Sequence, residues 1–190
     1  MGPRPWAPRP PEGRWGHETA IRFALVRSQE LYVYIIYTLM FTFSAPESKY
    51  WVIVASRDHV ARGLSEGICQ ANHGKEAPLK RMKKGDGVVF YSPKEKFGED
   101  EKCRRFTAIG QVADDVVYQV HLQGGFSPFR RRVAFAPCRE VSIEPLIPEL
   151  SFFRNKRSWG LVFRFGLIQI AREDFTKIAS AMLPPPKEAA

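Results

Sequence analysis

Positive charge and aromatic rings are concentrated between Gly67 and Gly98, in the segment GICQANHGKEAPLKRMKKGDGVVFYSPKEKFG. The middle of this segment is basic and contains Lys80, Arg81, Lys83 and Lys84. A short apolar strand is expected next, from Gly87 to Tyr91, and it leads into Tyr-Ser-Pro-Lys, which ends at Lys94. Lysine and arginine neutralise phosphates, and aromatic faces stack on nucleobases. The segment therefore predicts phosphate and base contacts that meet at one strand end.

A second run of the same character joins two aromatic residues to three arginines, in Phe126-Ser127-Pro128-Phe129-Arg130-Arg131-Arg132. Within the first segment, His73 can donate to a phosphate or stack on a base, and the pattern fits an ordinary loop histidine equally well. For any single aromatic residue, packing in the core is the safer interpretation, and each charge cluster alone fits a solvated face. The residues predicted to contact a nucleic-acid backbone are His73, Lys75, Lys80, Arg81, Lys83, Lys84, Lys94, Phe129, Arg130, Arg131 and Arg132.

No catalytic motif accompanies these groups. Only Asp58, His59 and His73 are acid/base candidates near the basic segment, and the sequence lacks a G-x-S-x-G or H-E-x-x-H motif. The three cysteines form no C-x-x-C pair, and the four histidines have no metal-ligand spacing. We therefore expect no catalytic residues, no metal, no cofactor and no disulfide framework, and a reducing, cytoplasmic environment.

Length and charge set further bounds. A chain of 190 residues has room for one compact core, and 44% hydrophobic residues is ordinary for a globular protein. The net charge of +9 favours a polyanionic partner such as DNA or RNA. The sequence leaves the oligomeric state open.

The first 47 residues differ from the rest of the chain. Residues 1 to 30 are rich in Pro, Arg, Gly and Trp, and the apolar run Leu31 to Phe43 is shorter than the roughly 18 residues of a membrane-spanning helix. A membrane anchor, a real extension and translation from too early a start codon compete, and a start near Met40 fits best. We expect an N-terminal extension over residues 1–47, a domain over 48–183, a tail over 184–190, and no stable membrane association.

Hydrophobic periodicity predicts a mixed fold. Strands are expected at 49–55, 88–91, 105–112, 116–122, 132–135 and 141–143, and an extended aromatic segment at 159–170. A helix is expected over 57–66, with Ser56 at its N-cap and Gly67 at its end. A helical turn over 145–150 and a closing helix through Phe175 and Met182 follow. These elements predict an α+β protein built on a small, mostly antiparallel β-barrel with flanking short helices.

Taken together, the motifs resemble the bacterial EVE-domain family. The resemblance rests on Lys49-Tyr50-Trp51, Ser56-Arg57-Asp58-His59, Gly67-Ile68-Cys69-Gln70, His73-Gly74-Lys75, Tyr91-Ser92-Pro93-Lys94, Pro128-Phe129-Arg130-Arg131 and Trp159-Gly160. It implies a PUA-like fold and a non-catalytic module that reads a modified base in DNA or RNA. It also implies a base pocket formed by Trp51, Ser56, Arg57, Ile68, Cys69, Gln70, Tyr91, Ser92, Pro93 and Trp159. Two other interpretations remain open: an RNA-processing or base-modifying enzyme that uses His59 or His73, and a barrel that binds a small nucleotide-like ligand.

Overall fold

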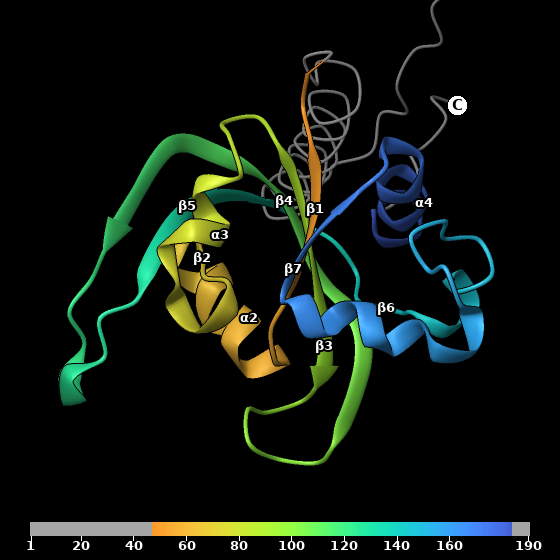
Figure 1. Ribbon diagram of the computed structural model, residues 1–190, viewed down its shortest axis with the longest axis horizontal. Coiled ribbons are helices and arrows are strands. Elements are labelled where there is room, and N and C mark those ends of the chain that lie inside the picture. Colours follow the sequence, from red (N-terminus) through yellow and green to blue (C-terminus); the bar gives the residue numbers. More distant parts are fainter. Residues whose placement is uncertain (1–46, 184–190) are drawn as a thin grey trace, which may run out of the picture. The chain divides into compact units, whose positions relative to one another are not determined.

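The computed structural model describes residues 47–183. Seven strands make one sheet in the order β2-β5-β4-β3-β1-β7, and β6 pairs with β4 (Figure 1). The strands are β1 (Tyr50–Val54), β2 (Ile68–Cys69), β3 (Gly87–Lys94), β4 (Lys102–Gln119), β5 (Phe129–Ala136), β6 (Val141–Ser142) and β7 (Leu167–Ile170).

The prediction of a mostly antiparallel sheet is confirmed, because β1 and β3 are the one parallel pair among the described strands. The prediction of a small β-barrel is not confirmed, because the sheet of the described strands is not closed. Strands β2 and β7 end the sheet at its two edges and do not pair with each other. The number of strands in a sequence does not say whether the two edge strands meet.

The helical elements are short and lie on both sides of the sheet. They are α2 (Arg57–Glu66), η1 (Asn72–Gly74), α3 (Glu76–Lys80), η2 (Gln123–Gly125), η3 (Glu144–Leu146), η4 (Lys156–Phe165) and α4 (Arg172–Met182). Figure 1 shows α2 and α3 on one side of β1 and β3, and α4 on the other. The mixed α+β class is therefore confirmed.

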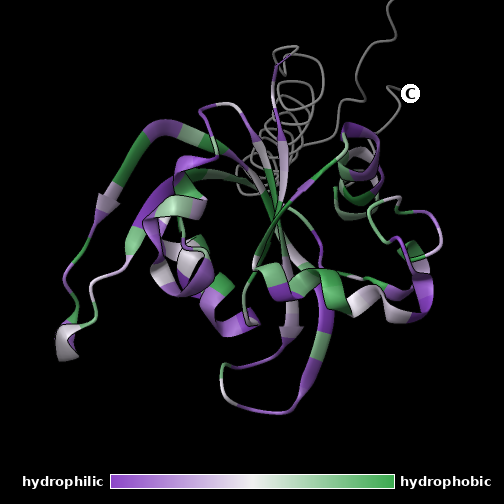
Figure 2. Ribbon diagram, in the orientation of Figure 1, coloured by the Kyte–Doolittle hydropathy of each residue, from purple (hydrophilic) through white to green (hydrophobic). Residues whose placement is uncertain are grey.

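Two hydrophobic clusters fill the two sides of the sheet. One packs Trp51, Ile53 and Val60 against residues of α3 and β3, and the other packs Val52 and Tyr91 against η4 and α4. Strands buried on both faces carry nearly continuous apolar runs. This explains the sequence YWVIV of β1, and Figure 2 shows the hydrophobic residues gathered where the central strands run between the helical layers.

Two local predictions differ in outcome. Helix α2 has the predicted bounds, and Gly67 ends it in the left-handed conformation with φ 67°. The extended segment predicted over 159–170 is wrong in its first part, because residues up to Phe165 form the 3₁₀ helix η4 and only Leu167–Ile170 form a strand. Gly166, with φ 71°, separates the two.

Among residues 47–183, no helix combines the length and the apolar character that crossing a bilayer requires. The expectations for the N-terminal extension and for the tail at 184–190 concern residues outside the described range, apart from Glu47.

Candidate functional site

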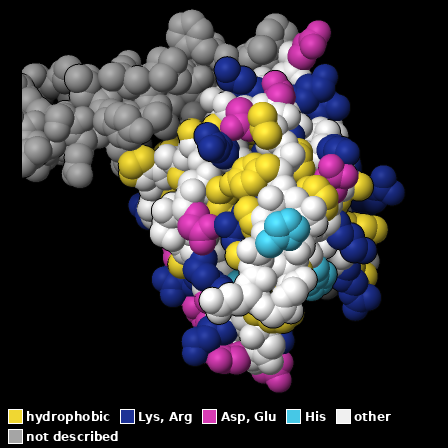
Figure 3. Space-filling model, turned by 90° about the vertical axis from the view of Figure 1, so that its left-hand side faces the viewer, with side chains coloured by type: hydrophobic (Ala, Val, Ile, Leu, Met, Phe, Trp, Pro, Cys, Tyr) yellow, Lys and Arg dark blue, Asp and Glu magenta, His cyan; other side chains and the backbone are white. Residues whose placement is uncertain are grey.

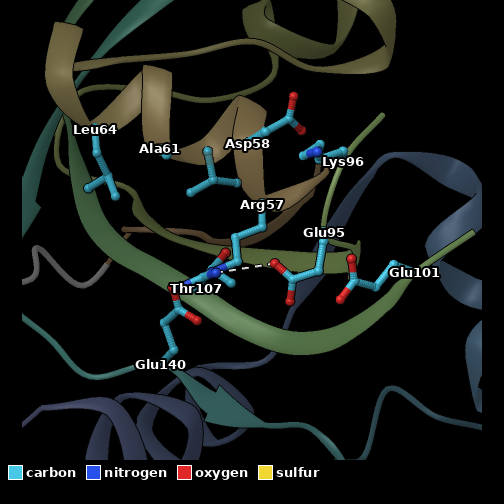
Figure 4. Close-up of a pocket in the computed structure, with 10 residues that line it drawn as sticks. Arg57, Asp58, Ala61, Leu64, Glu95, Lys96, Glu101, Thr107 and Glu140 are labelled. Carbon is cyan, nitrogen blue, oxygen red and sulfur yellow. Dashed lines mark hydrogen bonds and ion pairs between the residues drawn. The ribbon is translucent and has the colours of Figure 1, made fainter. Parts of the chain in front are cut away.

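A depression of about 630 Å³ opens between helix α2 and the ends of β3 and β4. Its wall on α2 is partly apolar, and its other side is polar (Figure 4). The residues that line it are Arg57, Asp58, Val60, Ala61, Leu64, Glu95, Lys96, Glu101, Thr107 and Glu140. We call this feature the α2 depression. Two cations and four carboxylates give its lining a formal charge of −2.

Arg57 is held in a fixed position at the start of α2. Its Nε donates to Glu140 Oε1 at 2.8 Å, and a terminal nitrogen donates to Glu95 Oε2 at 3.2 Å. The hydrogen bond to Glu140 and the charges of both carboxylates raise the pKa of Arg57 above its ordinary value. Figure 4 shows the side chain extending from α2 toward these two residues. The guanidinium therefore links α2, the end of β3 and the segment before β6.

Two buried oxygens lie beside Arg57. Within residues 47–183, Ser56 Oγ and Asp58 Oδ1 are shielded from water and make no hydrogen bond of ordinary geometry, although the nearby Ser56 hydroxyl contributes most to lowering the pKa of Asp58. The other oxygen of Asp58 accepts from Arg62 at 2.9 Å. Burial disfavours the charge on Asp58, but local hydrogen bonds and positive charges outweigh it, and the pKa of this carboxyl lies below its usual value. Asp58 is therefore an ionised acceptor at neutral pH, with no hydrogen bond of ordinary geometry to its Oδ1.

The predicted base-pocket residues are divided by the fold. Arg57 lines the α2 depression, and Ser56 lies beside it. Ser92 is fully buried and shares a 2.8 Å hydrogen bond with Thr107, which lines the depression. Pro93 is half-buried at the end of β3. These four positions fall in one region of the molecule.

The aromatic members of that prediction lie elsewhere. The ring of Tyr91 stacks on Phe163 with 3.9 Å between centroids, and burial raises the pKa of its hydroxyl to about 12. Trp159 is half-buried and meets Tyr91 edge-on at 6.3 Å. Trp51 is 1% exposed, and its Nε1 donates to Asp86 at 2.8 Å. None of these three rings lines the α2 depression, and each packs in a core cluster or against one.

The segment that begins β2 is also interior. Ile68 and Cys69 are buried, and Gln70 is half-buried. Burial raises the pKa of the Cys69 thiol to about 12, so it carries almost no thiolate at neutral pH.

The basic side chains Lys80, Arg81, Lys83 and Lys84, which we call the basic turn, are exposed and precede β3. The α2 depression lies at the other end of β3, near Glu95. Eight strand residues at about 3.3 Å each separate them by about 26 Å. The basic turn and the Tyr-Ser-Pro-Lys segment that ends at Lys94 therefore lie at opposite ends of β3, and not together at one strand end as expected.

The basic turn has a fixed backbone. The buried carboxylate of Asp86 accepts from the amides of Lys49 and Lys83, both at 3.0 Å, and Asp115 accepts from the amide of Lys84 at 2.8 Å. Figure 3 shows Lys and Arg side chains spread among acidic ones over the side of the molecule that it views, rather than in one block.

The three arginines of β5 have different environments. Arg132 has a 71% exposed side chain, whereas that of Arg131 is 2% exposed. Arg130 is 15% exposed and pairs with Glu66 at 2.6 Å. Arg131 donates to the carbonyl oxygens of Leu79 and Asp114 at 3.0 and 2.7 Å. Its burial leaves no surface for a phosphate.

The remaining predicted backbone contacts lie near the surface. His73 and Lys75 are exposed, and Phe129 is half-buried. Lys94 pairs with Asp100 at 2.9 Å.

Most of the lining of the α2 depression was missed by the sequence reasoning. Ala61 and Leu64 follow Arg57 at i+4 and i+7, a spacing that marks one helix face and was available as a signal. No pattern in the sequence connects Glu140 to Arg57, since 83 positions separate them. The described residues contain no group of three or more His, Cys, Asp or Glu side chains that could hold a metal ion.

Comparison of the sequence with known proteins identifies the family of this chain. The sequence matches the EVE domain over residues 49–181. It is 52% identical over 128 residues to a UPF0310 protein from Bacillus licheniformis, and the match covers 67% of this chain and 87% of the relative. A UPF0310 protein from Mycolicibacterium vanbaalenii is 48% identical over 135 residues, with 71% and 93% covered.

Among solved structures, the YTH domain-containing protein mmi1 in complex with RNA overlaps with 70% of this chain and 80% of its own, at 12% identity and a TM-score of 0.48. The match to the EVE domain and the identities to the UPF0310 proteins show that this chain belongs to the EVE domain family, a member of the PUA-like superfamily.

Proposed function

We propose that this protein binds nucleic acid by taking one modified base, carrying an exocyclic amino group, into the α2 depression, and that it performs no chemistry on it. Membership of the EVE domain family supports a fold that binds nucleic acid or a modified base. The proposal adds the place of binding and the class of base.

The size and lining of the depression suit a flipped base. Its volume of about 630 Å³ lies within the 300–1,000 Å³ that is usual for small-molecule sites. Val60, Ala61 and Leu64 provide apolar surface on α2, while Thr107 and the Arg57 guanidinium provide polar groups. A base taken out of its stack needs apolar contact for its face and hydrogen bonds for its edge. The lining offers both.

The buried carboxylate oxygen Oδ1 of Asp58, which has no hydrogen bond of ordinary geometry, carries the proposal. A buried acceptor without a hydrogen bond is unfavourable by about 1–3 kcal/mol, and a ligand that donates to it recovers that free energy. Cytosine, adenine and guanine present an exocyclic NH₂ group as a donor, at N4, N6 and N2, whereas thymine and uracil have none. An ionised Asp58 accepts from such a group and repels a phosphate. We therefore infer a derivative of a base that has an amino group, and we test cytosine and adenine derivatives.

The phosphates must then lie outside the depression, because its lining has a formal charge of −2. Exposed cations elsewhere on the domain, such as Lys75, Lys83 and Arg132, are the proposed backbone contacts. Such contacts give affinity that falls with salt and carries no base preference.

The test is a pair of substitutions that remove the same charge. Asp58→Asn replaces one acceptor oxygen by an amide donor, and Asp100→Asn does so at a carboxylate that is also in a 2.9 Å ion pair but lies on the surface. Both changes remove one negative charge and strengthen general attraction for nucleic acid slightly. Fluorescence polarisation then compares DNA and RNA pentamers with cytosine, 5-methylcytosine, 5-hydroxymethylcytosine, adenine or N6-methyladenine in the middle.

We expect the wild-type chain to prefer one modified base, and Asp58→Asn to weaken that complex by about tenfold or more, since a hydrogen bond to a charged group contributes about 1.5–3 kcal/mol. Asp100→Asn should keep the preference. Equal behaviour of the two variants, or a wild-type chain that binds all the pentamers alike, contradicts the proposal. A free nucleoside that binds as tightly as the pentamer would point instead to a small-molecule receptor.

A further inference from the structure

A group of rings lies beside the α2 depression without lining it. Phe97, on the connection between β3 and β4, has 65% of its surface exposed. His59 stacks on its ring, with 5.4 Å between centroids and 22° between planes, and His73 meets it edge-on at 6.2 Å. We call His59, His73 and Phe97 the aromatic ledge. At this degree of exposure, Phe97 offers solvent a ring face that His59 does not cover.

The ledge adjoins the depression through the chain itself. His59 directly follows Asp58, and Phe97 directly follows Lys96, and both of these preceding residues line the depression. The amide of Asp58 also donates to the carbonyl oxygen of Glu95 at 3.0 Å, which fastens the start of α2 to the connection that carries Phe97. The ledge and the depression are therefore parts of one continuous surface.

The backbone under the ledge is held in an unfavourable conformation. Asn72 and His73 are two successive non-glycine residues with positive φ, at 49° and 59°. L-amino acids avoid this region, and such residues persist where the surrounding structure imposes them, often at binding sites. Within the described part of the chain, the buried Oδ1 of Asn72 also has no hydrogen-bond partner. The fold thus holds the His73 ring against Phe97 at a cost.

We propose that the aromatic ledge stacks the nucleobase that neighbours the one in the α2 depression. This inference rests on the proposed function and adds a second, adjacent nucleotide to it. A base is flat, with an aromatic face for Phe97 and polar edges for the charged side chains around it, whereas an apolar partner would leave those charges desolvated. Lys75 is exposed two residues after His73, and it can neutralise the phosphate that joins the two nucleotides. The bound strand is unpaired at both positions.

The experiment measures how each protein variant binds pentamers with and without flanking bases. Phe97→Ala removes the ledge ring, and Leu161→Ala removes another exposed apolar side chain, 52% exposed on η4, as the matched control. The ligands are fluorescein-labelled DNA and RNA pentamers with cytosine or 5-methylcytosine, or adenine or N6-methyladenine, in the middle. Each pentamer is made with thymine or uracil flanks and again with abasic flanks. The melting temperature of each variant is measured first.

With base-bearing flanks, Phe97→Ala should weaken binding by about tenfold, because stacking on an aromatic side chain contributes at that scale per base. With abasic flanks, Phe97→Ala should bind like the wild-type chain, and Leu161→Ala should match the wild-type chain with both kinds of flank. If Phe97→Ala weakens binding equally with both kinds of flank, or does not weaken it at all, the proposed stacking on the aromatic ledge is wrong.

The two proposals fail separately. If the middle-base modification matters and Phe97→Ala changes nothing, the ledge is wrong and the depression stands. If Phe97→Ala weakens binding only with base-bearing flanks and the modification is not sensed, the ledge stands and the reading of a modified base is wrong. A wild-type chain that binds no pentamer at low salt overturns both.

Discussion

Replacing Arg131 and its neighbour Arg132 by Ala should have opposite consequences, although the sequence presents them as equivalent. Arg131 is 2% exposed and donates three hydrogen bonds, to Leu79 O at 3.0 Å, to Asp114 O at 2.7 Å and to Asp115 Oδ1 at 3.2 Å. Arg132 is 71% exposed, and its nearest carboxylate oxygen, on Asp114, lies at 4.0 Å. One side chain holds the structure together, and the other is free for a ligand.

The expected loss for Arg131→Ala follows from these contacts. The two bonds to carbonyl oxygens contribute about 1.5 kcal/mol or more each, since the donor is charged, and the contact to the exposed Asp115 carboxylate contributes little. The total is about 3 kcal/mol, which for a domain of this size lowers the melting temperature by about 10 °C. Arg132→Ala should change stability by less than about 0.5 kcal/mol.

The assay joins thermal unfolding, followed by circular dichroism, to binding of an unmodified 20-nucleotide DNA at several salt concentrations. Arg132→Ala should remove one phosphate contact and so reduce the magnitude of the slope of log K against log salt by about 1. Arg131→Ala, measured well below its lower melting temperature, should leave that slope unchanged. Arg131→Lys keeps the positive charge but loses the planar guanidinium, which donates to several oxygens at once, so this variant should also be less stable than the wild-type chain. The reasoning is refuted if Arg131→Ala melts within about 2 °C of the wild-type chain and lowers the salt slope as Arg132→Ala does.

Three further changes test the packing around the site. Burial raises the pKa of Cys69 to about 12, so alkylation by iodoacetamide at pH 8 should be about a thousandfold slower than for a free thiol until denaturant is added; fast labelling of the native chain would contradict this. Asp86→Ala leaves three buried or half-buried donors without their acceptor and should lower the free energy of unfolding by about 3 kcal/mol, with Asp86→Asn losing roughly half of that in urea titrations. A Cβ at Gly166 would overlap Asn72 Oδ1, whereas Gly98 has nothing within 4 Å, and both have positive φ. Gly166→Ala should therefore destabilise by about 2 kcal/mol more than Gly98→Ala, and equal losses would show that the overlap relaxes freely.

The sequence predicted the elements whose signals are local. Helix α2 has its predicted bounds because Val60 and Gly63 face the sheet and Gly67 can adopt a left-handed C-cap. Two strands were expected, over 105–112 and 116–122, but the structure has the single strand β4. Its pairing with β5 shifts register between Val112 and Val117, and the strand continues through Asp114 and Asp115. An irregularity of this kind looks like a strand end when only the sequence is available.

The failures come from contacts between distant residues. The aromatic residues of η4 favour a strand by intrinsic propensity, yet Phe163 stacks on Tyr91 and Trp159 packs beside it, which holds the segment as a helix. Sheet closure depends on β2 and β7, which are 98 positions apart from Cys69 to Leu167 and do not meet.

The candidate site was predictable only in part. Arg57 and Ser56 came from a motif, but the carboxylate of Glu140 reaches Arg57 only in the folded chain. Arg131 could have been separated from its neighbours, because successive residues of a strand point to opposite faces, and the middle one of three must point away from the other two. The separation of the basic turn from Glu95 was available from the sequence, because the segments before and after an eight-residue strand lie at its opposite ends.

The most direct test of the account is an NMR titration of the ¹⁵N-labelled chain with the pentamer whose modified base binds best. The account predicts that the amide signals of Arg57, Ala61 and Leu64 shift first, and that the unmodified pentamer shifts them less at equal concentration. Shifts confined to Lys83 and Lys84, or identical shifts from both pentamers, would contradict the reading of a modified base in the α2 depression.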